Sequence, residues 1–382
     1  MRRLRPVRRE VSHRGNCNKG PIAPSLKLPF SYQSLAGVFY LSFSERNVKL
    51  NLKRQRKPAL WRVGIISAFI IALSLFQYAR QQKPFRHQTF ALDTIVELEV
   101  WGAGGREAAE AAVAEIRRIE GLLSQYQPGS DLSLLARRGS ATVAPQTLEV
   151  LGQALAMAKA SAGAYDPTVG KLSRLWGEAR EKQKLPRAED VARARFEVGW
   201  QKVSIAPSGI VRIPVGMQLD LGGCAKGYAV DRALGVLKAH GVKRALVNAG
   251  GQVGLLGAAP KGAWKIGIKH PRKEGLLAVV QVRQGAVSTS GDYQRYFYAQ
   301  GKRYHHLLDP LTGYPASKCQ SATVIARTGI LADLLSTACF LLGPEEGLPL
   351  VAKFKAQALV ADSSGKIYAT DGLSYALAKE RD

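Results

Sequence analysis

Apolar and polar positions divide the chain into short elements. Phe90 to Val100 alternates in the manner of a strand, and apolar residues from Ala109 to Leu123 then recur at the spacing of one helix face. Ser130 or Asp131 is placed to cap a short helix. Further helices are predicted at 146–161, 178–197, 224–240 and 331–342, and strands at 202–206, 211–214, 217–220, 244–248, 264–269, 277–283, 286–289, 295–299, 321–326, 357–361 and 366–369. Strands with interspersed helices predict α/β or α+β layers.

The glycines within 102–105 separate the first predicted strand from its helix, as in dinucleotide-binding folds. The third glycine of that fingerprint would fall at Glu107, and no acidic residue closes a second strand at the required distance. We therefore expect a plain turn here.

An uncharged apolar run covers residues 63–79. From Trp61, 17–19 residues at about 1.5 Å each come close to the ~30 Å thickness of a bilayer core. Trp61 and Tyr78 suit the two interfaces, and basic residues precede the run (Lys53, Arg54, Arg56, Lys57, Arg62). The positive-inside rule then predicts a signal anchor at 61–79 in the inner (cell) membrane, with the part of the chain that follows it extracytoplasmic or periplasmic. A cleavable signal peptide is the alternative, but no clear cleavage site follows.

The chain has 382 residues, 46% of them hydrophobic, and a net charge of +26. Residues 1–60 hold 14 Lys or Arg against Glu10 and Glu45, and residues 80–382 carry a net +13. We expect residues 1–60 to be a disordered cytoplasmic tail, unless translation begins near Val48 or Leu52. Because the basic tail adjoins the apolar run, its positive charge is explained by the orientation of the predicted anchor in the membrane. No nucleic-acid partner is therefore expected. One folded domain is predicted at 88–380.

The four cysteines show neither metal-ligand spacing nor a disulfide framework. Cys224 lies in a glycine loop and could be mistaken for a nucleophile. No base is visible near it in the sequence, so we expect a small buried residue.

That loop is the most informative stretch of the chain. Residues 220–231 read Asp-Leu-Gly-Gly-Cys-Ala-Lys-Gly-Tyr-Ala-Val-Asp. The double glycine lets main-chain groups approach a ligand, a helix N-terminus attracts anions, and Lys226 adds a charge suited to phosphate. The glycine spacing of a Walker loop is absent. A phosphate-binding loop and a tight turn with a solvated lysine both remain open on this pattern alone.

Five further motifs accompany the loop, in order: Ala-Gly-Ala-Tyr-Asp-Pro-Thr-Val-Gly at 162–170, Leu-Val-Asn-Ala-Gly-Gly at 246–251, Ala-Val-Ser-Thr-Ser-Gly-Asp-Tyr at 286–293, His-His-Leu-Leu-Asp-Pro-Leu-Thr-Gly-Tyr-Pro at 305–315 and Leu-Ala-Asp-Leu-Leu-Ser-Thr-Ala at 331–338. Together they resemble the ApbE-type FAD:protein FMN transferases from about residue 90 onward. The resemblance implies an α+β fold, ApbE-like or T-fold-like, with mixed β-sheets and flanking helices.

A metal site is predicted on the helix at 331–342. Asp333, Ser336 and Thr337 stand at i, i+3 and i+4, hence on one face, and a carboxylate with two hydroxyls suits Mg²⁺. The alternative is a helix-start aspartate with two hydroxyls bonded to their own backbone. The family resemblance implies Asp333 and Thr337 as metal ligands, with a main-chain oxygen of Gly223.

FAD contacts are implied by the same resemblance. Asp220 and Lys226 would meet FAD in the glycine loop, where a lysine near the diphosphate makes electrostatic sense. The other implied contacts are Ala164, Tyr165 and Asp166, with Leu307, and more loosely Leu92 and Tyr126 against a ring of FAD. Tyr126 could equally be a half-buried surface aromatic.

Two residues are candidates for proton transfer. The family counterpart of His306 sits close to the reacting phosphate, and a histidine titrates in a useful range. His305 would point the other way if this segment is a strand. Asp292 is a second candidate base, or a turn cap. Both histidines could instead be structural.

Two positions depart from the family pattern. Gln252 stands where an acidic residue often follows Asn-Ala-Gly-Gly, and Asp93 replaces the usual glycine before Thr94. Because the implied metal and FAD residues remain, we expect an active enzyme.

The resemblance therefore implies Mg²⁺-dependent transfer of FMN from FAD to a Thr or Ser of a flavoprotein, releasing AMP. The resemblance implies acceptors such as subunits of ion-pumping or electron-transfer complexes, or FMN-binding-domain proteins. The alternatives are a metal-dependent FAD pyrophosphatase, which would use the same residues, and a non-catalytic flavin-binding protein.

Overall fold

The computed structural model describes residues 65, 67–69, 83–259 and 262–378. Its long helices are α2 (Gly105–Leu123), α3 (Asp131–Arg138), α4 (Pro145–Ala160), α5 (Gly170–Glu181), α6 (Ala188–Phe196), α7 (Ala225–Ala239), α8 (Gly329–Leu342) and α9 (Pro344–Lys353), with a short 3₁₀ turn at Trp200–Lys202.

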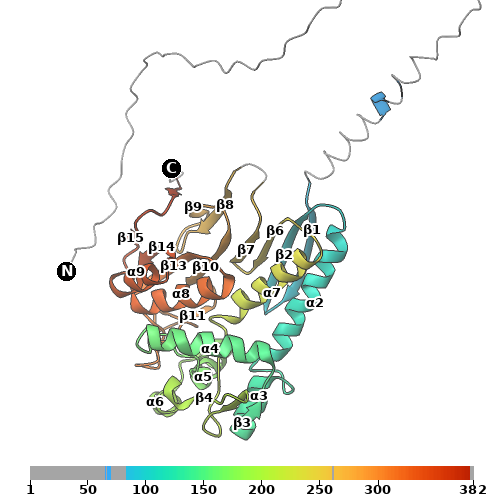
Figure 1. Cartoon of the computed structure of the whole chain (residues 1–382). Coiled ribbons are helices and arrows are strands. Elements are labelled where there is room, and N and C mark those ends of the chain that lie inside the picture. Colours follow the sequence, from blue (N-terminus) through green and yellow to red (C-terminus); the bar gives the residue numbers. More distant parts are fainter. Residues whose placement is uncertain (1–64, 66, 70–82, 260–261, 379–382) are drawn as a thin grey trace, which may run out of the picture. The chain divides into compact units, whose positions relative to one another are not determined.

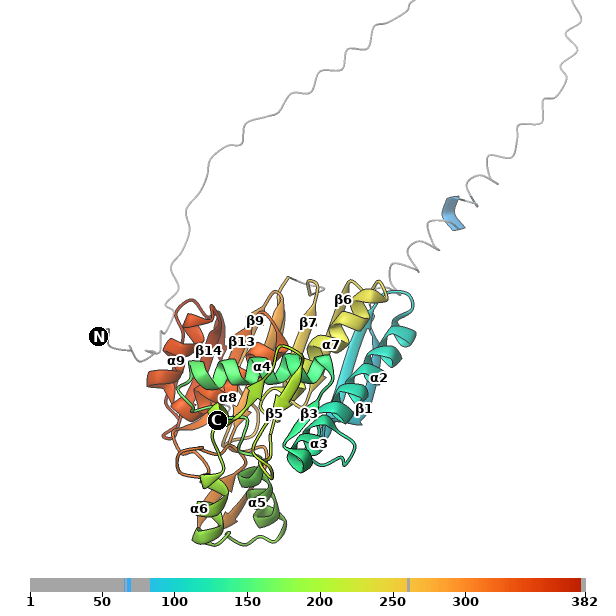
Figure 2. The ribbon, with the colours of Figure 1, turned by 60° about the horizontal axis from the view of Figure 1, so that its bottom comes forward.

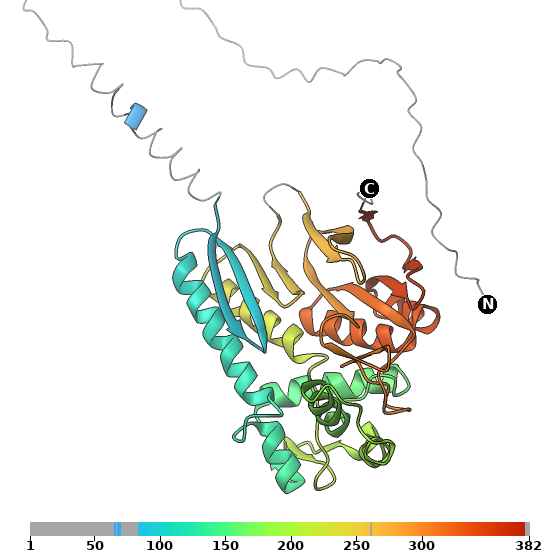
Figure 3. The same ribbon diagram turned by 180° about the vertical axis from the view of Figure 1, so that it is seen from behind.

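One eight-stranded sheet organises the described region (Figures 1 and 3). In spatial order its strands are β1 (Phe85–Ala91), β2 (Thr94–Trp101), β6 (Arg244–Ala249), β7 (Gln252–Leu256), β10 (Gly285–Gly291), β13 (Cys319–Ala326), β14 (Gln357–Asp362) and β15 (Ile367–Ala369). Every neighbouring pair is antiparallel. Val96 pairs with Ala249, so the sheet joins segments far apart in the sequence.

Helices α2, α7 and α8 cover one face of this sheet, and α4 packs against α8 (Figures 1 and 2). The amphipathic α2 turns its alanine, valine and isoleucine face inward, while α8 is apolar on nearly all sides and buried from Gly329 to Phe340. The core therefore lies between the sheet and this helical layer.

Helices α7 and α8 approach each other closely at two glycines. A Cβ on Gly227 would lie 2.2 Å from the carbonyl oxygen of Gly329. Asp231 caps α8 at the same place, accepting hydrogen bonds from the backbone nitrogens of Gly329 (2.6 Å) and Ile330 (2.9 Å). Burial raises the pKa of Asp231 to about 6. The contact fixes α8 relative to the start of α7.

Smaller sheets flank the main one. Strands β8 (Trp264–Lys269), β9 (Leu276–Val282) and β16 (Tyr375–Leu377) form a three-stranded sheet, β11 (Tyr296–Ala299) and β12 (Lys302–His305) a hairpin, and β3 (Ser140–Thr142), β5 (Ile210–Arg212) and β4 (Ser204–Ile205) another three-stranded sheet. The hairpin packs on α5 and α6 through Trp176, Val191 and Phe297. The α+β prediction is confirmed.

Several predicted elements differ from the structure. Leu92 and Asp93 (φ +55° and +57°) turn the expected single strand at 90–100 into the β1–β2 hairpin. Residues 217–220 form no strand, and the backbone nitrogen of Asp220 donates to the Pro167 oxygen at 2.7 Å. The region 178–197 holds the end of α5 and all of α6, separated around Pro186. Strands β3, β7, β12 and β16 and helix α9 were not predicted.

The expected tail at 1–60 lies outside the described residues. So does most of the expected anchor at 61–79, of which residues 65 and 67–69 are described and helical. Within the described ranges, no helix is both long and apolar enough to cross a membrane.

Candidate active site

A cavity of about 1190 Å³ opens where β10, α8, the 220–226 loop and the segment before β11 meet. It is lined by most of the predicted site residues, namely Leu92, Tyr126, Tyr165, Asp166, Asp220, Gly223, Lys226, His306, Leu307, Asp333 and Thr337. Ala164, Asp292 and Ser336 do not line it. Residues from six distant segments therefore share one cavity, which is large enough for a dinucleotide-sized ligand.

Buried oxygen atoms form the floor of the cavity between α8 and β10. Asp333 is 4% exposed and accepts hydrogen bonds from the Ser288 hydroxyl (3.2 Å) and the Gly227 backbone nitrogen (3.0 Å). Ser290 bonds to both Ser336 (3.0 Å) and Thr337 (3.2 Å). These hydrogen bonds allow polar groups on an otherwise apolar helix to be buried.

The 220–226 loop lies directly over this floor. A Cβ on Gly223 would lie 3.0 Å from a ring carbon of Tyr165 and 3.2 Å from the Thr337 hydroxyl oxygen, so the glycine allows the loop backbone to approach without crowding these side chains. Asp220 accepts a hydrogen bond from the Gly222 nitrogen (2.7 Å), and Lys226 donates to the Gly222 oxygen (3.2 Å). The folded loop brings main-chain groups, Asp333 and Thr337 together.

These oxygens are the ligand type that Mg²⁺ prefers. The described part of the chain holds no group of three or more His, Cys, Asp or Glu side chains that could bind a metal ion. A cation here would have Asp333 as its carboxylate, with hydroxyl and main-chain oxygens, and would keep positions for water or phosphate oxygens. The donor set therefore fits Mg²⁺, and fits soft metals poorly.

Tyr165 and Asp166 form a buried part of the wall. The Tyr165 hydroxyl donates to Cys224 Sγ at 3.5 Å, and burial raises the pKa of both groups. Asp166 accepts from the Thr168 nitrogen (2.8 Å), the Thr168 hydroxyl (2.6 Å) and the Trp200 nitrogen (3.1 Å). Cys224 is buried with a raised pKa, as expected of an unreactive thiol.

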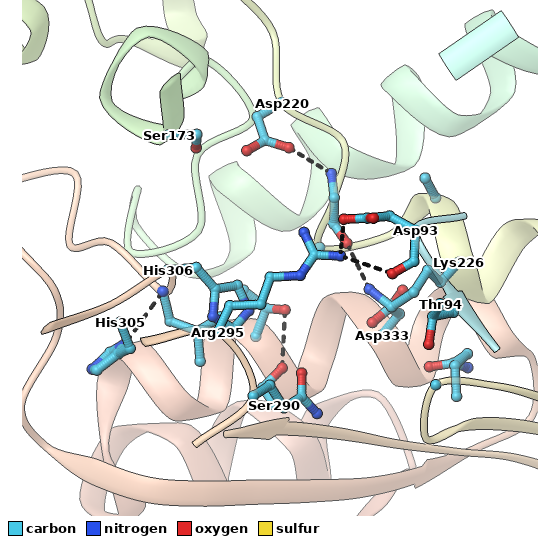
Figure 4. A pocket seen from close by; sticks show the side chains of 18 of the residues that line it. Asp93, Thr94, Ser173, Asp220, Lys226, Ser290, Arg295, His305, His306 and Asp333 are labelled. Carbon is cyan, nitrogen blue, oxygen red and sulfur yellow. Dashed lines mark hydrogen bonds and ion pairs between the residues drawn. The ribbon is translucent and has the colours of Figure 1, made fainter. Parts of the chain in front are cut away.

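The two histidines occupy different environments, as Figure 4 shows. His305 is buried, with Nε2 2.8 Å from the Ala316 oxygen and Nδ1 accepting from the Leu307 nitrogen at 3.2 Å, which marks a structural residue. The His306 ring is accessible from the cavity and has no hydrogen-bond partner among the described residues. Protein surrounds it at short range, and this desolvation, then Arg295 and Lys226, lowers the pKa of His306 to about 3.

The carboxylate of Asp292 is bound by two arginines, which leaves it poorly placed to accept a proton from a substrate. Arg272 binds both of its oxygens (2.7 and 2.6 Å), and Arg303 lies 3.3 Å from one of them. The carboxylate is 7% exposed and lies outside the cavity lining. This geometry favours a structural ion pair that fixes the start of the β11 segment over a role for Asp292 as a base.

Comparison with known proteins identifies the family. A profile described as the ApbE family matches residues 92–360. The FAD:protein FMN transferase of Treponema pallidum (strain Nichols) is 31% identical over 320 residues, covering 77% of this chain and 88% of that protein. The chain belongs to the ApbE family. It is accordingly a transferase.

Two solved structures support the ApbE assignment. The crystal structure of the Thermotoga maritima ApbE protein superposes with a TM-score of 0.71 at 34% identity, covering 76% of this chain and 97% of that one. The apo form of Pseudomonas stutzeri flavinyl transferase ApbE gives a TM-score of 0.66 at 32% identity, covering 76% and 95%.

The sequence-based prediction missed residues of this ApbE cavity. Ser288 and Ser290 alternate along β10, so both face α8, and this alternation within Val-Ser-Thr-Ser was a usable signal. Arg295 lines the cavity and forms an ion pair with Asp93 at 2.9 Å. Gln252 is also buried at the wall, where its Nε2 donates to the Gly329 oxygen (3.1 Å).

Proposed function

We propose that this protein transfers FMN from FAD to a threonine or serine hydroxyl of a flavoprotein, using Mg²⁺ and releasing AMP. One observation carries the proposal. The Asp333–Thr337 floor, the Gly223–Lys226 loop and His306 line one cavity large enough for FAD. The names of the ApbE relatives supply the substrate class.

Asp333, Thr337 and a main-chain oxygen of Gly223 would hold Mg²⁺. When bound, Mg²⁺ would neutralise the negative charge of the FAD diphosphate and the negative charge that develops on the departing AMP. Lys226 adds a positive charge beside the same loop. Tyr126, which is 70% exposed at the cavity edge, and Leu92 would contact a ring of the substrate.

His306 would receive the proton of the acceptor hydroxyl. The hydroxyl oxygen attacks the phosphorus on the FMN side, the bond from that phosphorus to the oxygen bridging to AMP breaks, and AMP departs with that oxygen. In the free protein desolvation, and after it the charges of Arg295 and Lys226, hold the pKa of His306 low. A bound diphosphate would offset the two charges and so raise the pKa of His306, which makes the ring a better base when substrate is present.

The acceptor would be a subunit of an ion-pumping or electron-transfer complex or a protein with an FMN-binding domain. We further propose a single-pass anchor at 61–79 with the catalytic domain at 88–380 on the extracytoplasmic side of the inner membrane. The motivation is the group of basic residues that ends at Arg62 and the uncharged run at 63–79 that follows it. Proteolysis of intact spheroplasts tests this, since a domain protected on the cytoplasmic side would refute it.

Intact mass spectrometry tests the transferase proposal. The full-length chain is incubated with FAD, Mg²⁺ and an FMN-binding-domain protein, and we expect the acceptor to gain the mass of one FMN phosphoester. Asp333→Asn should abolish the gain, whereas Asp190→Asn, an exposed aspartate paired with Arg187, should not. FMN and AMP released without modification of any acceptor would indicate a pyrophosphatase, and FAD left intact would indicate a binding protein.

A further inference from the structure

An ion pair crosses the cavity from the β1–β2 turn to the segment before β11. Arg295 Nη2 lies 2.9 Å from Asp93 Oδ2 and 3.5 Å from the Asp93 carbonyl oxygen. The pair joins positions 202 residues apart. Figure 4 shows the Arg295 side chain extended through the cavity with its guanidinium beside Asp93. Both side chains are solvent-accessible, so the pair contributes little to stability by itself.

The turn that presents Asp93 has an unfavourable backbone. Leu92 and Asp93 are consecutive non-glycine residues in the left-handed region, at φ +55° and +57°, and a Cβ makes this conformation costly. Glu120 holds the turn by accepting a hydrogen bond from the Leu92 nitrogen at 2.9 Å. In this conformation the carboxylate and the carbonyl oxygen of Asp93 both reach the same nitrogen of Arg295.

Most of the guanidinium remains available to a ligand. Because Asp93 occupies Nη2, Arg295 Nε and Nη1 have no hydrogen-bond partner in the described part of the chain. The Arg295 carbonyl accepts from the His306 nitrogen (3.2 Å), and the charges of Arg295 and Lys226 both act on the His306 ring. The free donors therefore lie in the part of the cavity where the reacting phosphate would be, and a planar guanidinium suits phosphate oxygens.

We propose that Arg295 binds the diphosphate of FAD and that Asp93 is a positioning residue that holds its guanidinium in place. The inference rests on the proposed function, because it assumes FAD in this cavity. Asp93 neutralises part of the charge on Arg295, which by itself would weaken the attraction to a diphosphate. It also restricts the long side chain of Arg295, so the guanidinium is already oriented and less conformational entropy is lost when a diphosphate binds.

Asp93→Gly separates positioning from folding. Glycine relieves the left-handed strain, so Tm of the full-length protein should be unchanged or higher. The Kd of FAD, measured by quenching of flavin fluorescence, should nevertheless rise by roughly three- to tenfold, because Arg295 is no longer held. Arg295→Ala should raise the Kd by roughly ten- to a hundredfold, since charge-assisted hydrogen bonds are lost. In the double variant the two effects should not add, because Asp93 acts through Arg295.

Two matched variants serve as controls. Gln300→Gly relieves a positive φ of 51° in the two-residue turn of the β11–β12 hairpin, at a residue that does not line the cavity. Arg86→Ala removes an exposed ion pair of the same 2.9 Å length at the far end of the β1–β2 hairpin. Neither should change the Kd of FAD. An Asp93→Gly protein that binds FAD as tightly as wild type, or additive effects in the double variant, would overturn the inference. Wild-type protein that binds no FAD would instead refute the proposed function.

Discussion

Asp333 is a buried carboxylate on an apolar helix, and its two oxygens accept hydrogen bonds from different elements, β10 and the start of α7. Thr337 stands one turn later beside Gly223. This pair could be predicted from the sequence because helical spacing alone places i and i+4 on one face. Arg295 could not, because its partner Asp93 is distant in the chain and meets it only through a turn of unusual backbone conformation.

Thr337→Val tests the metal role of a single hydroxyl. The side chains are similar in size, and Ser290 keeps its bond to Ser336, so we expect little loss of stability. The Mg²⁺ concentration for half-maximal transfer should rise by roughly ten- to a hundredfold, since a ligand oxygen is lost. Thr323→Val removes the buried hydroxyl that pairs with Thr289 and should leave this concentration unchanged. Equal Mg²⁺ dependence in both variants would contradict the assignment.

The low pKa of His306 predicts a specific pH dependence of stability. The folded pKa is about 3 and the ordinary value 6.5, so between these limits the unfolded chain binds more protons than the folded one. This contribution to the free energy of unfolding is complete above pH 6.5 and is lost as pH falls toward 3. Between pH 6.5 and pH 3, the free energy of unfolding measured with urea should fall less steeply in His306→Gln than in wild type. If the free energy of unfolding depends on pH in the same way in both proteins, the pKa of His306 is not lowered by folding.

At the scale of elements, the site depends on where α7 and α8 touch. The close approach at Gly227 and Gly329, with the Asp231 cap, sets the glycine loop against the oxygens of α8. The helices and this loop could be predicted because their periodicity and glycines are local. The β6–β7 hairpin was missed although Gly250-Gly251 is a typical two-residue turn, and the strand predicted at 217–220 was wrong because that extended segment pairs with no neighbouring strand.

Replacing each of two glycines of α7 by alanine should change the stability of the protein in opposite directions. Gly227→Ala places a methyl group 2.2 Å from a backbone oxygen and should destabilise the protein by roughly 1–3 kcal/mol or more. Gly235→Ala, on the same helix with open space around it, should stabilise it by roughly 0.5–1 kcal/mol through helix propensity. Denaturant unfolding measures both, and a neutral Gly227→Ala would mean that the helices can separate without cost.

At the scale of the whole molecule, we expect the fold to be stable without a metal ion. The oxygens of the cavity floor are already hydrogen-bonded to one another, and the core is continuous across the main sheet. Chelation should therefore leave Tm nearly unchanged and lower FMN transfer by roughly two orders of magnitude or more. Restored transfer on adding Mg²⁺ is the control, and unfolding on chelation would show a structural metal instead.

The order of strands in the main sheet also bears on how this protein is made. Strand β2 lies between β1 and β6, and Glu97 pairs with Asn248, so the sheet cannot close until that distant segment has left the ribosome. The cavity floor comes later still, with α8. A nascent chain thus has no complete cavity for most of its synthesis, and activity arises only after α8 has been produced.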